Sequence, residues 1–422
     1  MTKNCVKTHE LNDKYFFKIG VKEYFIEFQN QKIPLYVFRP INMADVKEVI
    51  IHIPGRNGNA KEYIEQTTLM NAYNTRLAVC VQMSQFNAYE FEFGNIFNEN
   101  DFDSETKCLK ENTTLSDSSS WTFNIVFTIL DFLKEKLEKT EMEYVLNGID
   151  AGGGFVQNLN FWFPLIDNPR KQYPKRSIVG VASFYFFLFS KSRMRLDYIS
   201  DIDTSKTATK TYKELINYNH VKKNCINNKN EKLIKNLKNE NALESYYDYI
   251  NNFFQYFKNP VNRDVQDITN TNVYQLSDNI PLQIFPVGVK NLPLSENQIQ
   301  QLQKQHCKQN IVFQFYEKDT NIYGGVTESG ENIPNLVSSC TSASTGQFRL
   351  FRGMNAWFST KIDARKKNYE FNWQYVVIPN CGHSSNFSNT SLLMSNTISQ
   401  DFWKNPRFCP EFFYFLKPEL FE

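Results

Sequence analysis

One stretch near the middle of the chain organises the rest of it: Tyr144-Val145-Leu146-Asn147-Gly148-Ile149-Asp150-Ala151-Gly152-Gly153-Gly154-Phe155. A short apolar run leads into a tight Gly-x-Asp-x-Gly turn, and small residues then open a helical pattern. This layout predicts a strand, a sharp turn and a helix, with the side chain at the centre of the turn presented at the sheet edge. That side chain belongs to Asp150, so the chemistry of the turn depends on what a carboxylate can do.

The sequence before this stretch predicts parallel strands joined by helices. Residues 46–53 form a continuous apolar run that suits a buried strand, and they end in the flexible loop Pro54-Gly55-Arg56-Asn57-Gly58, which exposes backbone N–H groups. Helical spacing follows over 61–73, and another strand over 76–83. This order of strand, loop, helix and strand is typical of βαβ units.

Three more segments extend this pattern in the first half of the chain. Residues 15–28 and 33–39 alternate apolar and polar side chains across a short turn, which predicts an antiparallel hairpin at a sheet edge. Residues 121–137 follow a run of N-cap candidates and repeat apolar side chains at helical spacing, so we expect a helix packed on the sheet. Residues 177–186 read as the strand after the central turn.

The second half of the chain predicts further core elements after an interruption. We expect strands over 281–288, 310–316 and 371–378, a helix over 296–306, a long hairpin or loop over 323–346, and a terminal helix within 402–421. Residues 190–280 are rich in Asn and Lys and keep only rough helical spacing. The sequence therefore predicts an α/β fold with a mostly parallel sheet, whose core (1–189 and 281–422) is interrupted by a helical cap insertion (190–280).

Composition excludes some classes of partner. The chain has 422 residues, and its 47 Lys and Arg against 45 Asp and Glu leave a net charge of +2, so no global field favours nucleic acid or an anionic membrane. No run of about 18 apolar residues predicts a transmembrane segment, and the N-terminus lacks a recognisable export signal. We therefore expect a cytoplasmic protein by default, with an organelle-associated assembly as an open alternative.

No cofactor or metal site is expected from the sequence. The eight cysteines are scattered without a C-x-x-C pair and are interpreted as free thiols. The triple glycine 152–154 is not followed by Lys-Ser/Thr, so it is not a phosphate loop. His9, His220 and His306 have no acidic or cysteine partners at metal spacing, and His52, within a buried strand, is expected to be a core histidine.

Three features have the order that an α/β-hydrolase requires: a Gly-rich loop after an early strand, a turn of the nucleophile-elbow type after a middle strand, and a Gly-His after the last strand. The chain resembles the polyhydroxybutyrate depolymerase and feruloyl esterase group of this superfamily. The resemblance rests on the loop 54–58, on 147–154 against the Gly-x-Ser-Ala-Gly-Gly elbow, on 288–291 and on Gly382-His383. It implies an α/β-hydrolase fold, backbone oxyanion donors at Gly55, Arg56 and Ala151, and a catalytic triad at Asp150, Asn291 and His383.

Two of these triad positions depart from the family pattern. Asp150 replaces the serine, and Asn291 stands where the resemblance places the acid. An asparagine cannot hold an imidazolium by charge, and the loss of such an acid costs several orders of magnitude in rate. Asp319, after a neighbouring predicted strand, is a candidate substitute for the acid.

These departures leave three functional hypotheses open. The first is a catalytically degenerate, esterase-like protein in which Asp150 fills the old site and the chain serves as a structural or interaction subunit among other protein subunits. The second is an active hydrolase of epoxides or esters, with Asp150 as nucleophile, His383 as base and Asp319 as orienting acid. Dedicated Asp nucleophiles are usually followed by a bulky residue, whereas Ala151 follows here. The third is a binder of an unidentified small molecule in the old acyl pocket.

Overall fold

An eight-stranded sheet forms the centre of the computed structural model. The structure describes residues 16–40, 43, 46, 48–55, 59–71, 77–104, 108–182, 185–189, 192–194, 273–275, 285–316, 323–326, 332–334 and 349–378. In spatial order the strands are β1 (Gly20–Phe28), β2 (Gln31–Arg39), β4 (Leu77–Val81), β3 (Glu48–Ile53), β5 (Glu143–Ile149), β6 (Arg176–Gly180), β9 (Ile311–Tyr316) and β12 (Gln374–Ile378). From β4 to β12 all neighbours are parallel, whereas β1 and β2 are antiparallel additions at one edge.

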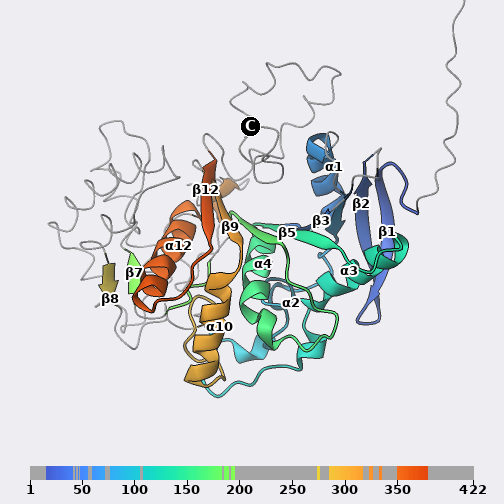
Figure 1. Ribbon diagram of the computed structural model, residues 1–422. Helices are drawn as coiled ribbons and strands as arrows, with labels where there is room; N and C mark the ends of the chain where they lie inside the picture. Colours follow the sequence, from blue (N-terminus) through green and yellow to red (C-terminus); the bar gives the residue numbers. More distant parts are fainter. Residues whose placement is uncertain are drawn as a thin grey trace, which may run out of the picture.

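Helices cover both faces of this sheet (Figure 1). One face carries α1 (Ala60–Asn71), which packs Tyr63 and Ile64 against apolar side chains of the parallel strands. The larger apolar core lies on the opposite face, where α4 and α10 are seen below the strands in Figure 1. The helices that contribute to that core are α2 (Ala88–Glu92), α3 (Asn124–Lys136), α4 (Ala151–Trp162), α10 (Glu296–Lys308) and α12 (Arg349–Lys366). Short 3-10 turns complete the connections: η1 (Glu99–Asp101), η2 (Ser118–Ser120) and η3 (Phe163–Leu165).

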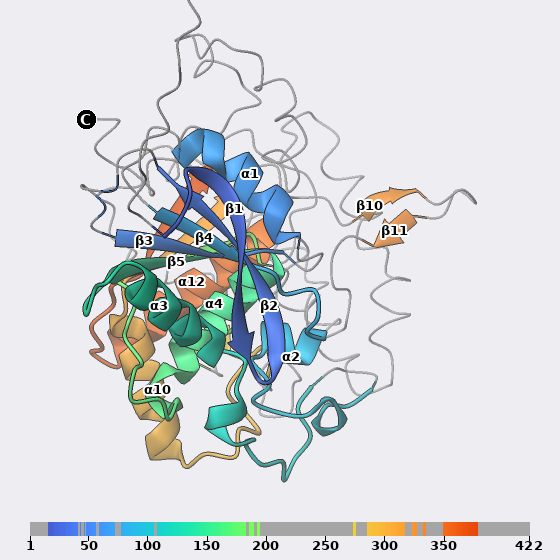
Figure 2. The ribbon, with the colours of Figure 1, turned by 90° about the vertical axis from the view of Figure 1, so that its right-hand side faces the viewer.

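The apolar pattern of the strands explains their places in the sheet. All five residues of β4 are buried, and so are five of the six residues of β3, as expected for parallel strands covered on both faces. By contrast, β1 alternates buried and exposed residues towards its end, which suits an edge. Gln29 and Asn30 both have positive φ (49° and 59°) and close the β1–β2 hairpin in two residues. The predicted edge hairpin, which faces the viewer in Figure 2, is therefore confirmed.

Most other predicted core elements are also confirmed, with small changes of boundary. The helix expected over 121–137 is α3, preceded by η2, and its apolar residues Ile125, Ile129 and Leu133 are buried. The strand expected over 177–186 ends earlier, at Gly180. The segment 323–346 begins with a small hairpin of β10 (Tyr323–Val326) and β11 (Asn332–Pro334). The remainder of that segment and the tail 402–421 lie outside the described residues.

The predicted strand 281–288 is wrong in its described part. Residues 285–288 form a turn, in which the Phe285 N–H donates to the Lys290 carbonyl oxygen at 3.2 Å. The Val287 carbonyl oxygen accepts instead from the Phe187 N–H, at 2.7 Å, in another loop. Phe285 and Val287 are buried, so their apolar character reflects a packed loop and not a sheet strand.

The predicted cap insertion, residues 190–280, is described only at two short strands near its ends. β7 (Ser192–Met194) and β8 (Val273–Gln275) pair antiparallel, which brings together residues about eighty positions apart in the chain. The helical character predicted for 190–280 falls on residues outside the described ranges, so it stays a prediction.

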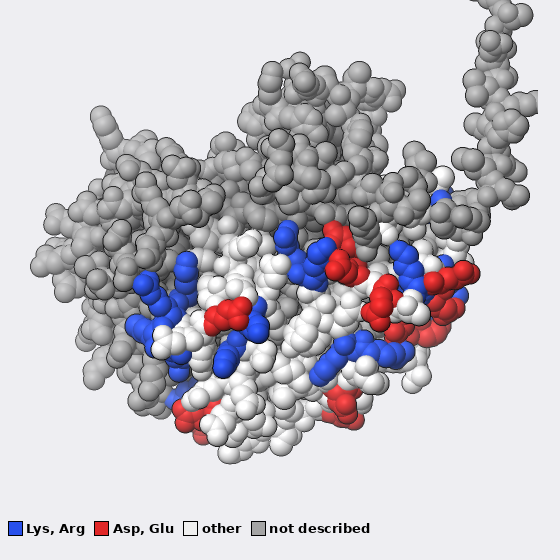
Figure 3. Space-filling view, in the orientation of Figure 1, with Lys and Arg blue, Asp and Glu red and all other residues white. Residues whose placement is uncertain are grey.

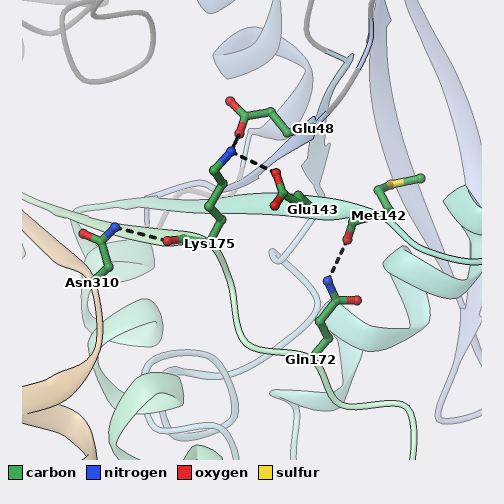
Figure 4. A network of polar contacts seen from close by, with 6 residues as sticks. All are labelled: Glu48, Met142, Glu143, Gln172, Lys175 and Asn310. Carbon is green, nitrogen blue, oxygen red and sulfur yellow. Dashed lines mark hydrogen bonds and ion pairs between the residues drawn. The ribbon is translucent and has the colours of Figure 1, made fainter.

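A polar network links the amino ends of the parallel strands (Figure 4). Lys175, just before β6, forms ion pairs with Glu143 at 2.8 Å and with Glu48 at 3.4 Å, the first residues of β5 and β3. The Asn310 side chain, just before β9, donates to the Lys175 carbonyl oxygen at 3.2 Å. These contacts join four strand starts. Ligands of parallel α/β sheets bind at the opposite edge, where the strands have their carboxyl ends. This network is therefore structural, and a functional site is expected at the carboxyl ends of the strands.

The described surface carries both signs of charge. In the view of Figure 3, groups of Lys and Arg lie beside groups of Asp and Glu across the described part of the face. Among the described helices, none has the length and apolar content needed to cross a membrane.

Candidate functional site

The central turn has the geometry of a nucleophile elbow. β5 ends at Ile149, and α4 begins at Ala151, so Asp150 alone forms the turn as the N-cap of the helix. Its backbone has φ 54° and ψ −118°, a conformation that costs a non-glycine residue about 1–3 kcal/mol. The Asp150 N–H donates to the Gly180 carbonyl oxygen at 3.0 Å, and the Asp150 carbonyl oxygen accepts from the Gly154 N–H at 3.2 Å. The strained turn is thus held by one hydrogen bond to β6 and one to α4.

Two glycines allow the close approach of backbone segments at this turn. A Cβ atom on Gly148 would lie 2.0 Å from the Gly152 carbonyl oxygen. A Cβ atom on Gly152 would lie 2.2 Å from the Ile53 carbonyl oxygen, at the end of β3. Real Cβ atoms do not approach backbone oxygens so closely, so α4 can start against β3 only because these side chains are absent.

The expected oxyanion loop lies beside Asp150. A Cβ atom built on Gly55 would be 3.3 Å from both Cβ and Oδ2 of Asp150, so the carboxylate lies over this glycine. Ala151, the other expected N–H donor, is buried at the first position of α4. Arg56 lies outside the described residues. The structure therefore brings Gly55, Asp150 and Ala151 together, while the oxyanion role assigned to them stays a prediction.

The Asp150 carboxylate has a partner that the sequence did not indicate. The Nη2 atom of Arg349, the first residue of α12, lies 3.5 Å from Oδ1 of Asp150. The Arg349 side chain is 3% exposed and that of Asp150 is 20% exposed, so the ion pair is largely removed from water. Charge-assisted contacts of this kind are stronger than contacts between neutral groups. Arg349 is 199 positions away in sequence, and no local pattern in the sequence connects it to the turn.

The Asn291 side chain is engaged with the backbone of a distant segment. Its backbone has φ 66°, and its side-chain Nδ2 donates to the Leu109 carbonyl oxygen at 3.2 Å. This bond ties the loop before α10 to the loop region 108–115. The structure thus shows a local structural use for the amide, and the triad position assigned to Asn291 stays a prediction.

His383 and Asp319 both lie outside the described residues, but the strands before them are described. β9 ends at Tyr316, three positions before Asp319, and β12 ends at Ile378, five positions before His383. Both strands run parallel to β5 in the same sheet. Their carboxyl ends therefore lie at the sheet edge that also carries Asp150.

His52 is a core histidine, as its place in the sequence predicted. It is fully buried in β3, and its Nδ1 lies 2.9 Å from Nδ2 of Asn147 on the neighbouring strand. Nδ2 of Asn147 also lies 3.3 Å from the hydroxyl of Tyr63 on α1. Burial lowers the pKa of His52 to about 3. His52 is accordingly neutral near pH 7. Its contact with Asn147, and that of Asn147 with Tyr63, join β3, β5 and α1.

Buried histidines predict a loss of stability in weak acid. Burial lowers the pKa of His306 to about 3 as well. Because both folded-state values lie below the unfolded value of about 6.5, the unfolded chain binds more protons between these limits. The free energy of unfolding should therefore fall as the pH falls below about 6.5, by about 2 kcal/mol for each histidine between pH 7 and pH 5. Urea unfolding at the two pH values measures this loss.

The matched variant for this prediction is His52→Asn, whose side-chain oxygen can accept the Asn147 bond without titrating. We expect its stability to decline by about 2 kcal/mol less than that of the parent protein over the same pH interval. An identical decline in the two proteins would show that His52 does not contribute.

The described part of the chain contains no cluster of three or more His, Cys, Asp or Glu side chains that could hold a metal ion. Cys80, Cys108 and Cys307 are buried free thiols, as the scattered cysteines predicted.

Two solved structures resemble the chain over nearly its whole length. Poly(aspartic acid) hydrolase-1 from Sphingomonas sp. KT-1 is 12% identical, with 90% of this chain and 99% of that chain covered and a TM-score of 0.52. LpqC, a poly(3-hydroxybutyrate) depolymerase from Bordetella parapertussis, is also 12% identical, with 92% and 95% covered and a TM-score of 0.53. No known protein-family profile and no curated protein sequence matches the chain. At such low identity the likeness shows the fold, and the chain has the α/β-hydrolase fold.

Proposed function

We propose that this α/β-hydrolase-fold, esterase-like protein is catalytically degenerate and acts by binding, as a structural or interaction subunit among other protein subunits. One observation carries the proposal: the side chain at the elbow is a carboxylate paired with the buried guanidinium of Arg349. In the fold, this position normally presents a nucleophile to the substrate. Here it presents a group already engaged inside the protein.

The chemistry of a carboxylate at this position supports the same reading. Attack by Asp150 on an ester carbonyl would produce an anhydride, so ester hydrolysis does not continue simply when Asp replaces Ser. Pairing with Arg349 at 3.5 Å stabilises the negative charge of the carboxylate and lowers its tendency to attack. The start of a helix also favours a negative charge that stays in place.

Retention of the elbow without its serine is consistent with a role in binding. Gly148 and Gly152 still permit the tight turn, and the strained backbone of Asp150 is kept. The two resembling proteins are named as a poly(aspartic acid) hydrolase and a poly(3-hydroxybutyrate) depolymerase. We propose that this chain uses the same scaffold to hold partner proteins, with the inserted region 190–280 as additional surface.

The test of this proposal is an activity panel combined with co-purification. Purified protein is assayed on short aryl esters and on epoxides, beside Asp150→Asn and His383→Ala variants as matched controls. We expect the parent protein to turn over no substrate above the level of the variants, and to co-purify stably with other proteins. Turnover that disappears in both variants would overturn the degenerate reading.

The alternative function is an active hydrolase, with Asp150 as nucleophile, His383 as base and Asp319 as orienting acid. It is favoured by the order of the sheet, since Asp319 follows β9 and His383 follows β12. For this alternative, epoxides are the informative substrates, because attack on carbon forms an ester that a histidine-activated water can cleave. Loss of epoxide turnover in Asp319→Asn, with turnover kept in Asn291→Ala, would identify Asp319 as the acid.

A further inference from the structure

The Asp150 carboxylate lies among groups that favour a negative charge. Its Oδ1 is 3.5 Å from Nη2 of Arg349. The residue is also the N-cap of the twelve-residue helix α4, whose dipole favours an anion, although the Asp150 side chain makes no capping hydrogen bond to the first N–H groups of the helix. Its Oδ2 lies 3.3 Å from the position that a Gly55 Cβ would occupy, so the carboxylate lies beside this glycine of the loop.

We infer that the elbow is a binding site for a small carboxylate, and that the Asp150 side chain is its tethered occupant. Arg349 supplies the charge of the site, and it is 3% exposed, unlike the partners of an ordinary surface pair. In the pair Arg170–Asp131, for comparison, the two side chains are 65% and 30% exposed. The inference rests on the proposed function, in which Asp150 is a held group and not a nucleophile.

The size of the site follows from the group that fills it. Beyond its Cα, Asp150 contributes one methylene and one carboxylate, which together match acetate except for one hydrogen atom. Gly55 lies beside this group, since a Cβ atom built on this glycine would be 3.3 Å from Oδ2 of Asp150. The side chain is 20% exposed, so a small solute can reach the site from water once the side chain is removed.

Chemical rescue tests the inference. Asp150→Gly removes the occupant, and glycine adopts the φ of 54° without strain. The melting temperature of this variant is measured by circular dichroism in sodium acetate and in sodium chloride of equal ionic strength. We expect acetate at ten times its Kd to raise the Tm by about 1–2 °C, with the parent protein unchanged.

Three controls identify the site. Neutral acetamide should give no rise in the Tm of Asp150→Gly, because Arg349 selects for charge. The double variant Asp150→Gly/Arg349→Met should not respond to acetate. Asp150→Asn, which fills the position with a neutral group of the same size, should not respond either. An equal rise with chloride, or an undiminished rise in the double variant, would overturn the inference.

A second variant keeps the test decisive if Asp150→Gly does not fold. Asp150→Ala retains the β carbon, so the missing group is the carboxylate alone, and formate should raise its Tm. If neither folded variant responds while the parent protein is inactive, the carboxylate site is excluded and the proposed function stands. Turnover of substrate by the parent protein would instead overturn the proposed function itself.

Discussion

Gly152→Ala is expected to lower the free energy of unfolding by about 4 kcal/mol or more, which is enough to abolish soluble expression. The new Cβ would lie 2.2 Å from the Ile53 carbonyl oxygen and 2.5 Å from the Pro54 carbonyl oxygen. Both are backbone atoms, so no flexible side chain can move aside. Relief requires α4 to shift away from the end of β3, and that shift disturbs the core packing of both elements. Urea unfolding followed by circular dichroism, together with the soluble fraction of the expressed protein, measures the effect.

Gly154→Ala is the matched control, two residues further along the same helix. Its Cβ would meet only the Glu92 Oε2 atom, at 3.9 Å, which is an ordinary contact. Because alanine is favoured over glycine inside a helix by up to about 1 kcal/mol, this variant should be as stable as the parent protein or slightly more stable. Equal destabilisation by the two substitutions would contradict the argument from close approach, since it would point to a general intolerance of α4.

The contrast between these glycines shows what the sequence could predict about the elbow. The Gly-x-Asp-x-Gly pattern after an apolar run predicted the strand, the turn and the helix, because turn and helix signals are local. The continuous apolar runs likewise predicted buried parallel strands. Which glycine tolerates a side chain depends on the end of β3, about one hundred positions away in the chain, and no local pattern reveals that contact.

Helix α12 was missed for a different physical reason. Its buried residues include Arg349, Arg352, Ser359, Thr360 and Asp363, together with Ala356, Trp357 and Ala364. Polar side chains on a buried face hide the periodicity by which an amphipathic helix is recognised. Arginine is also rarely buried unless it is paired, so its sequence position gave no reason to place it inside. The partner of Asp150 therefore emerged only from the tertiary structure.

The wrong strand at 281–288 reflects an ambiguity of short apolar runs. Phe285 and Val287 are as apolar as strand residues, and both are fully buried. Phe285 packs in a cluster of aromatic rings that includes Phe93, Phe97 and Trp162. A packed loop and a buried strand have the same composition over a few residues, so periodicity alone does not separate them.

The Asp150–Arg349 pair is expected to show a coupling energy of about 1–2 kcal/mol in a double-mutant cycle. The cycle compares Asp150→Asn, Arg349→Met and the double variant by urea unfolding at pH 7. Each single variant should lose stability, and the double variant should lose less than the sum, because the second substitution removes a charge that has already lost this partner. The expected coupling energy is lower than that of a fully buried pair, since the Asp150 side chain is 20% exposed and the contact is 3.5 Å long.

Arg170 and Asp131 provide the control cycle with the same two residue types. Their atoms approach more closely, at 2.6 Å, but the side chains are 65% and 30% exposed. Solvent screening should therefore reduce their coupling to less than about 1 kcal/mol despite the shorter distance. If the elbow pair coupled no more strongly than this surface pair, Arg349 would not be holding Asp150 in place. The proposed loss of activity would then have to be explained by the residues expected to activate Asp150, His383 and its acid, and not by internal pairing.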